Sequence, residues 1–191
     1  MPTSLENLRS ERRRKLQVRE SFSRGLAFFR ASGADPLPFY LACGEYLAAG
    51  QRRLIDQDGR LVDMLAPRVP AAQAQDHDAI RMLRERLALA ARSLADFEAA
   101  LGSLRRRGAV ARKEFEEASE RFLDLLVNVL GARSHSLRHL TTTLLDEGDW
   151  RQIVDCTPEF EAAESAAYAA VSRLAPPGLA PDGIDTQPAG R

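Results

Sequence analysis

Apolar side chains recur along most of this chain with the spacing of an α-helix. The clearest case is a seam in which each apolar residue follows the previous one by three or four positions. Its members are Ile80, Leu83, Leu87, Ala90, Leu94, Phe97, Leu101 and Leu104. Such a stripe covers one helical face, which must be buried against another element. No segment alternates apolar and polar residues as a half-buried strand does, so the pattern predicts an all-α protein.

Breaks rich in proline and glycine divide the chain into helical blocks. We expect helices at about 5–31, 37–66, 72–104 and 109–146, and a short helix at 158–173. The short helix has its own start signal, because Thr157 is a good N-cap and Pro158 suits the first helical position. Long amphipathic helices joined by short connections bury their stripes best as an antiparallel four-helix bundle. We therefore predict one bundle domain over 1–173, followed by a proline-rich, disordered tail over 174–191.

The overall composition is that of a globular chain without a strong charge bias. Lys+Arg and Asp+Glu both number 27, which argues against a nucleic-acid-binding protein. No apolar run is long enough for a membrane span, and the first residues lack the apolar core of a secretory signal, so we expect a cytoplasmic protein. One basic cluster, Arg12, Arg13, Arg14 and Lys15, is either a helix face that meets acidic residues of a neighbour or a contact for an anionic partner.

Charged or titratable residues interrupt three of the predicted seams. Asp58, His77 and Arg133 each stand where the helical period expects an apolar side chain. A charge on a buried seam costs free energy unless it is paired, neutralised or bound to a metal. Helical bundles build metal sites from such positions, so these residues are the first candidates for chemistry.

The chain over about 36–155 resembles the hemerythrin-like (HHE cation-binding) family. The stretch 76–80, DHDAI, is similar to the start of that family's third helix, which carries a histidine ligand. The stretch 122–150, FLDLLVNVLGARSHSLRHLTTTLLDEGDW, is similar to its fourth helix and closing turn, and 53–61 is similar to the His-x-x-x-Glu segment of its second helix. The resemblance implies a four-helix bundle built around a non-haem diiron centre.

The same resemblance implies that this centre is lost here. It puts Leu54 and Val129 at histidine ligands and Asp58 and Arg133 at carboxylate ligands, so that Asp58 and His77 alone keep ligand-type side chains. A guanidinium at Arg133 would repel a pair of cations. We expect Arg133 to bind Asp58 instead, as a salt bridge inside the bundle, and His77 to be a hydrogen-bonded core histidine.

Two further histidines, His135 and His139, are spaced i,i+4, which can hold one metal ion on a helix face. Their helical phase points both to the flank of the predicted fourth helix. They are therefore either solvent or interface residues or a ligand pair.

Three classes of function follow. The first is a hemerythrin-like bundle without its diiron site that acts as a binding, regulatory or structural module, with a protein partner or a second copy. The alternative is a non-haem metal-binding protein that senses or stores iron, oxygen or NO. Its remodelled site would use His77, Asp58, His135 and His139. A third class, an enzyme or a small-ligand carrier, requires a sizeable apolar pocket with a few convergent polar groups.

Signatures of catalysis and of redox chemistry are missing from the sequence. It contains no P-loop, GxGxxG, HExxH or GxSxG motif, so an enzyme is not the favoured interpretation. The two cysteines, Cys43 and Cys156, are far apart and form no metal-binding or disulfide pattern. We expect both to be small buried or half-buried side chains.

Overall fold

In the computed structural model, which describes residues 4–130 and 137–184, every regular element of these ranges is helical. The α-helices are α1 (Ser4–Ser32), α2 (Leu37–Leu65), α3 (Ala74–Arg107), α4 (Arg112–Asp124), α5 (Arg138–Leu144), α6 (Glu147–Val154) and α7 (Pro158–Leu174). Short turns of other helix types lie between or after them: η1 (Ala66–Arg68), η2 (Gly108–Ala111), the π-helical η3 (Leu125–Leu130) and η5 (Pro181–Gly183). The all-α prediction is confirmed for the described ranges. None of these helices has an apolar stretch that would reach across a bilayer.

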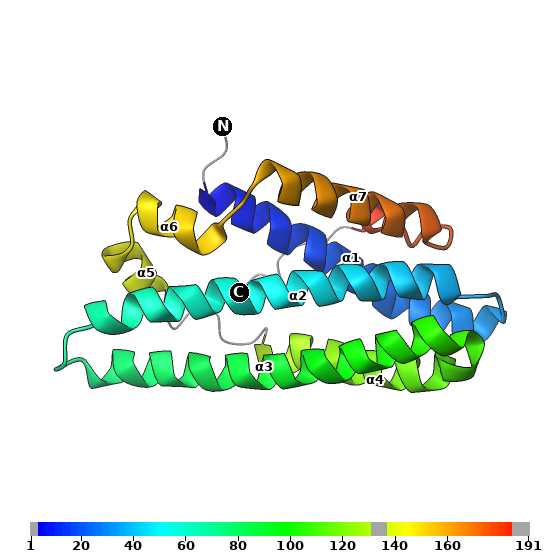
Figure 1. Cartoon of the computed structure of the whole chain (residues 1–191), viewed down its shortest axis with the longest axis horizontal. Helices are drawn as coiled ribbons and strands as arrows, with labels where there is room; N and C mark the ends of the chain where they lie inside the picture. The colour runs from blue at the N-terminus through cyan, green and yellow to red at the C-terminus, as the bar shows by residue number, and fades with distance from the viewer. Residues whose placement is uncertain (1–3, 131–136, 185–191) are drawn as a thin grey trace.

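The long helices lie side by side. Figure 1 shows α2 and α3 side by side along most of their length and running in opposite directions, with α4 behind the second half of α3. Helix α1 packs against α2 and α4, and α7 lies over α2 and α1. Helices α5 and α6 sit at the end of the molecule where α2 leads into α3. Helices α2 and α7 thus pack against each other, and α1 contacts both.

Local signals set the ends of these helices. Asp35 accepts the backbone N–H of Leu37 through Oδ1 at 3.0 Å, at the start of α2. Helix α3 stops at Gly108, whose φ of 56° is a left-handed value that glycine adopts at little cost. The Thr157 hydroxyl accepts the N–H of Phe160 at 3.2 Å and caps α7, as the sequence indicates.

The apolar interior consists of two clusters. The larger one joins α1, α2, α3 and α4 around an aromatic group made of Phe22, Phe29, Phe39, Tyr40, Phe97, Phe115 and Phe122. The smaller one joins the end of α2 to the start of α3 and to α5, through Val62, Leu65, Val69, Ile80, Leu137 and Leu140. Between them α2 buries two polar residues, Gln51 and Gln57, at 1% and 2% exposure. Gln51 and Gln57 thus form a polar band in the middle of α2.

The region expected as one fourth helix, 109–146, is broken in the structure. Helix α4 passes at Leu125 into the π-helical turn η3, and α5 ends at Leu144. Leu145 is extended (φ −115°, ψ 136°), and Asp146 begins a separate helix, α6, that the sequence analysis did not foresee. The reason is a capping box, because Asp146 accepts the N–H of Asp149 at 2.9 Å and Asp149 accepts that of Asp146 at 3.1 Å.

The expectation of a disordered tail fails for its first part. Residues 175–184 lie along α1, where Leu179 accepts a hydrogen bond of 2.6 Å from the Ser21 hydroxyl. Ile184 is only 5% exposed, and Pro176 and Pro181 are also buried. A few apolar contacts and a buried hydroxyl are enough to hold this short segment, and composition alone does not reveal them.

A pair of glycines in α2 tests how closely α2 and α3 approach. A Cβ at Gly44 would stand 2.6 Å from Leu101 Cδ1, whereas a Cβ at Gly59 would meet nothing within 4 Å. Gly44→Ala should therefore lower the free energy of unfolding by about 1–2 kcal/mol. Gly59→Ala should raise it by about 0.5–1 kcal/mol, because alanine favours the helix. Urea denaturation of both variants gives the two signs. Equal stabilisation by both substitutions would show that α2 and α3 do not approach each other this closely at Gly44.

Candidate functional site

The structure does not gather the sequence-predicted metal positions into one site. Asp58 lies on α2, where its Oδ1 accepts a hydrogen bond from Arg12 Nη2 of α1 at 3.2 Å. Burial raises the pKa of Asp58 and the charge of Arg12 opposes that rise. Leu54 is half-buried one turn earlier. His77 is exposed in the first turn of α3, so the expectation of a core histidine is wrong. Its turn lies beyond the last buried residue of the α3 seam, Ile80.

Only some of the predicted site residues on the expected fourth helix lie within the described residues. Arg133 and His135 lie outside the described residues, so the Asp58–Arg133 salt bridge stays a prediction. His139 on α5 contacts Asp76 of α3, with Nε2 and Oδ1 2.9 Å apart, and its side chain is 62% exposed. The predicted ligand His139 thus lies at the molecular surface, beside Asp76, which directly precedes the predicted ligand His77.

This donor set does not fit a diiron centre of the hemerythrin type. The side chains of Leu54 and Val129 carry no donor atom, and the carboxylate of Asp58 is held by Arg12. Over residues 4–130 and 137–184, no group of three or more His, Cys, Asp or Glu side chains converges as a metal site would require.

The acidic closing turn that carried the resemblance has a structural role. Asp149 completes the capping box of α6. Arg68 of η1 donates two hydrogen bonds to its carboxylate, at 2.5 and 2.7 Å. These hydrogen bonds from Arg68 lower the pKa of Asp149 to about 2. The turn thus ties α6 to the connection between α2 and α3.

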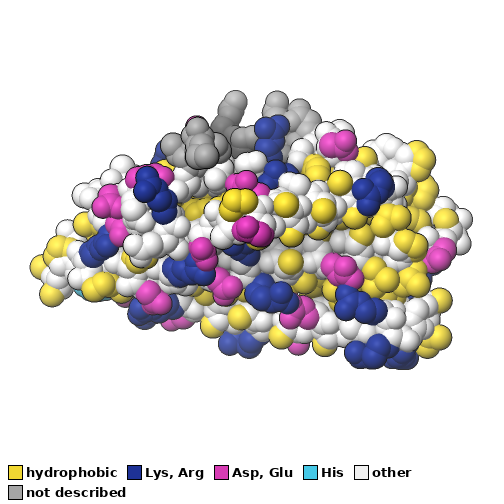
Figure 2. All heavy atoms as spheres, turned by 45° about the horizontal axis from the view of Figure 1, so that its top comes forward, with side chains coloured by type: hydrophobic (Ala, Val, Ile, Leu, Met, Phe, Trp, Pro, Cys, Tyr) yellow, Lys and Arg dark blue, Asp and Glu magenta, His cyan; other side chains and the backbone are white. Residues whose placement is uncertain are grey.

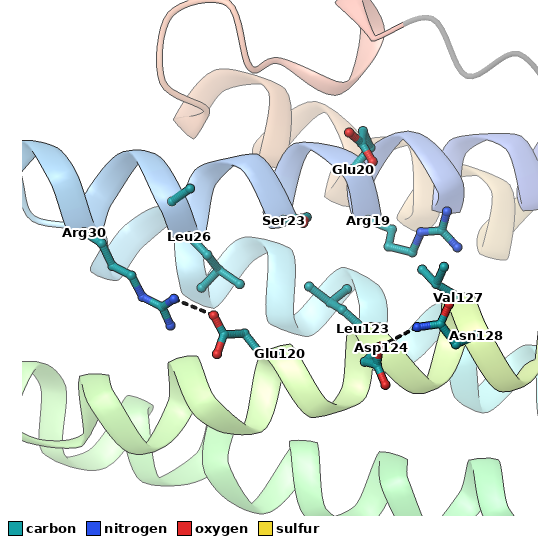
Figure 3. A pocket seen from close by; sticks show the side chains of 11 residues that line it. Arg19, Glu20, Ser23, Leu26, Arg30, Glu120, Leu123, Asp124, Val127 and Asn128 are labelled. Carbon is teal, nitrogen blue, oxygen red and sulfur yellow. Dashed lines mark hydrogen bonds and ion pairs between the residues drawn. The ribbon is translucent and has the colours of Figure 1, made fainter.

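One hollow of the surface lies between α1 and α4, with a volume of about 340 Å³ (Figure 3). Leu26 and Leu123 form its apolar part, and Arg30 reaches across it to Glu120. Asn128 of η3 donates to Asp124 at 2.5 Å on the far side. Four polar side chains of this hollow thus bind one another in two pairs.

A larger groove lies between α2 and α7, with α1 below, and its volume is about 440 Å³. Figure 2 turns α7 toward the viewer and shows hydrophobic side chains gathered where α7 lies against α2. Six of its fourteen lining residues are small: Ala42, Ala49 and Gly50 from α2, and Ala163, Ala167 and Ala170 from α7. The volume lies within the range of roughly 300–1,000 Å³ that is typical of small-molecule sites. We call it the α2–α7 groove.

Three larger side chains of α7 hold the helix over its neighbours and leave the groove beside them. Phe160 lies under the guanidinium of Arg53, whose Cζ is 3.7 Å from the ring centre. Glu164 binds Arg14 at 2.7 Å and also accepts a hydrogen bond from the Tyr46 hydroxyl. Tyr168 donates a hydrogen bond to Gln17 Oε1 at 2.9 Å. Because the alanines between these anchors are too short to fill the space, the groove stays open.

Lys15 is the polar group at the base of the α2–α7 groove. Its Nζ donates to the amide oxygen of Gln51 at 2.5 Å, and its aliphatic stem runs past Gly50. Burial lowers the pKa of Lys15 to about 7, and the charge of Arg12 adds to that effect. Asp58 and Glu11 act in the opposite direction. A lysine that is only part-charged near neutral pH is an unusual component of an apolar groove.

Lys15 should make stability depend on pH. Its pKa in the unfolded chain is the ordinary value of about 10.4, so between pH 7 and 10.4 the unfolded state binds more protons and stability rises with pH. Lys15→Met removes this dependence. Relative to the variant, the wild type should therefore gain about 1–2 kcal/mol of unfolding free energy between pH 6 and pH 9. Urea denaturation at both pH values measures it.

Lys113, the other lysine of the chain, provides the control. Its side chain is 91% exposed and its nearest carboxylate, Glu117, lies 3.9 Å away. Lys113→Met should leave the pH dependence unchanged. A wild type and a Lys15→Met variant with parallel pH profiles would contradict a lowered pKa at Lys15.

The sequence pattern places Lys15 with its neighbours in one basic cluster. In the structure Arg12 and Arg14 bind Asp58 and Glu164, Arg13 is exposed, and Lys15 faces the groove. The groove itself was missed. Its one sequence signal was the alternation of alanine pairs with large residues along 158–173.

The cysteines lie as expected. Cys43 is buried in the larger cluster and burial raises the pKa of its thiol well above the ordinary value. Cys156 is half-buried, and burial together with Glu161, whose Oε1 is 3.3 Å from its Sγ, raises its pKa to about 11. Neither thiol has the lowered pKa of a reactive cysteine.

Compared with models of protein families, with curated proteins and with solved structures, the chain matches none.

Proposed function

We propose that this chain is a hemerythrin-like, antiparallel four-helix bundle without a diiron centre, and that it works as a binding module for a small molecule in the α2–α7 groove. The mutual packing of α1, α2, α3 and α4 around one aromatic cluster supports the bundle. The groove supports the binding role. It combines an apolar lining with few polar groups, which is the combination that a small-ligand carrier requires.

A neutral apolar probe tests the binding role. Octanol should bind in the groove with a dissociation constant of about a millimolar, because apolar burial alone drives the association. In NMR spectra of protein labelled at alanine methyl groups, the groove alanines Ala49, Ala163 and Ala167 should shift on titration. Alanines far from the groove, such as Ala118 in the interior, should not.

A matched pair of tryptophan variants localises the binding. Ala167 lines the groove, whereas Ala166 is exposed on α7 and is not part of the lining. Ala167→Trp should fill the groove and abolish the octanol shifts, and Ala166→Trp should leave them unchanged. Octanol shifts that are absent from the wild type, or that survive Ala167→Trp, would contradict the proposed function.

Metal analysis tests the loss of the diiron centre. We expect chain that is produced with iron, manganese and zinc, and purified without a chelator, to hold far less than one metal ion per chain. A tightly bound stoichiometric metal would instead favour the alternative, a remodelled metal site that uses His77, Asp58, His135 and His139.

A further inference from the structure

We propose that the ligand of the α2–α7 groove is an amphiphilic carboxylate, whose anionic head binds Lys15 and whose apolar chain lies along the alanines of α2 and α7. This inference rests on the proposed function and specifies the chemistry of its ligand.

The first step is the charge balance of the groove. Three of its acidic residues already have basic partners: Glu11 binds Arg53, Glu45 binds Arg105 and Glu164 binds Arg14. Of the basic residues, Arg12 binds Asp58. Lys15 differs, because in the described part of the chain its ammonium donates to the neutral amide of Gln51 and has no carboxylate within 4.0 Å. Lys15 is thus a cation without a carboxylate in direct contact, and Asp58 and Glu11 act on it only from further away.

The second step is the sign of the ligand. A cationic head group would meet Lys15 and find every acidic residue of the lining engaged. A neutral ligand would leave the ammonium of Lys15 in an apolar environment with one hydrogen bond. An anionic oxygen supplies the missing charge and accepts a further N–H, and such charge-assisted hydrogen bonds are the strong ones.

The third step is the charge and shape of the head. A single ammonium matches one negative charge, whereas a phosphate dianion needs several donors or a forked guanidinium. Both guanidiniums beside Lys15, on Arg12 and Arg14, are committed to Asp58 and Glu164. A carboxylate therefore fits better than a phosphate.

The fourth step is the room for an apolar chain. The apolar part of the lining includes Ala49, Gly50 and Leu54 on α2 and Ala163 and Ala167 on α7. None of these side chains can hydrogen-bond, and a volume of about 440 Å³ holds a chain of several methylene groups.

Three probes of equal chain length test the inference: octanoate, octanol and octylammonium. At pH 6, where Lys15 is protonated, octanoate should bind about tenfold more tightly than octanol, and octylammonium more weakly than either. Lys15→Met should weaken the binding of octanoate about tenfold and that of octanol far less. Lys113→Met, which changes an exposed lysine, should alter neither. Alanine-methyl NMR shifts give all the affinities.

The pKa of Lys15 gives an independent measurement. The chain has only Lys15 and Lys113, so NMR of labelled lysine side chains follows each one separately. Saturation with octanoate should raise the pKa of Lys15 from about 7, and Lys113 should not respond. Octanol should leave both unchanged.

The outcomes separate the two proposals. Equal affinity for octanoate and octanol would overturn the carboxylate head but keep the groove as a binding site. No binding of any probe would overturn both proposals. A chain that dimerises in sedimentation and becomes monomeric with Ala167→Trp would also overturn both, because a second copy would then occupy the groove.

Discussion

Glu116→Ala should lower the free energy of unfolding by about 2–4 kcal/mol. The Glu116 side chain is 9% exposed and accepts hydrogen bonds from Arg30 at 2.9 Å, from Arg112 at 2.8 Å and from the Tyr40 hydroxyl at 2.8 Å. The substitution leaves the hydroxyl of Tyr40, which is fully buried, without its acceptor. The two arginines are 42% and 29% exposed and can turn to water, which limits the loss.

Glu120 offers a matched control for this prediction. It also binds Arg30, but its side chain is 52% exposed. Glu120→Ala should therefore change stability by no more than about 0.5 kcal/mol. Guanidinium chloride denaturation at pH 7 compares the two variants. Similar losses in both would show that Arg30 rather than the buried carboxylate holds this end of the molecule.

The same carboxylate should govern stability in acid. Burial alone would raise the pKa of Glu116, but the hydrogen bonds from Arg112, Arg30 and Tyr40 outweigh it and keep the pKa below its ordinary value. Its contribution is therefore present above about pH 4.3 and is lost as the pH falls through the lower folded-state value. Glu116→Gln should flatten that part of the acid-unfolding curve.

Phe97→Ala should lower the free energy of unfolding by about 3–5 kcal/mol. Phe97 is fully buried on α3 and stacks on Phe122 of α4, with ring centres 4.4 Å apart and planes 6° from parallel. Its ring also lies 5.8 Å from that of Phe115. The rigid helices around it cannot close the cavity, so the loss includes both transfer and cavity costs.

Phe28→Ala is the control for the aromatic cluster. Phe28 is 39% exposed and touches Phe29 edge-on, with ring centres 5.2 Å apart. We expect a loss of about 1 kcal/mol or less, since little apolar area leaves water at this position. Thermal unfolding of both variants measures the contrast. A Phe97→Ala variant as stable as Phe28→Ala would mean that the cluster relaxes freely.

Helical periodicity predicts faces, and it therefore predicts much of this fold. The seam of block 72–104 contains Ile80, Leu94 and Phe97, which are all buried on α3. Periodicity does not show where a helix changes register. The passage from α4 into η3 at Leu125 and the new start at Asp146 depend on local hydrogen bonds, of which only the Asp146–Asp149 spacing is visible in the sequence.

The candidate site was less accessible to sequence reasoning. Asp58 is engaged by a charged residue on another helix, but in the described part of the chain that residue is Arg12 of α1. A helical wheel gives the face on which Asp58 lies and not the helix that lies across from it. Lys15 differs from Arg14 in its partner, because Lys15 meets the neutral Gln51 of α2 and Arg14 meets the acidic Glu164 of α7. These partners depend on how the helices pack and are not visible in the sequence.

The polar band in the middle of α2 has a further consequence. Buried Gln51 and Gln57 stand along α2 between the aromatic cluster and the small cluster around Leu65, and α2 and α3 contribute residues to both clusters. Free energy of local opening follows the number of apolar contacts that must be broken. We therefore expect the end of the molecule that contains α5 and α6, whose apolar cluster is the smaller one, to exchange its amide hydrogens faster than the aromatic end.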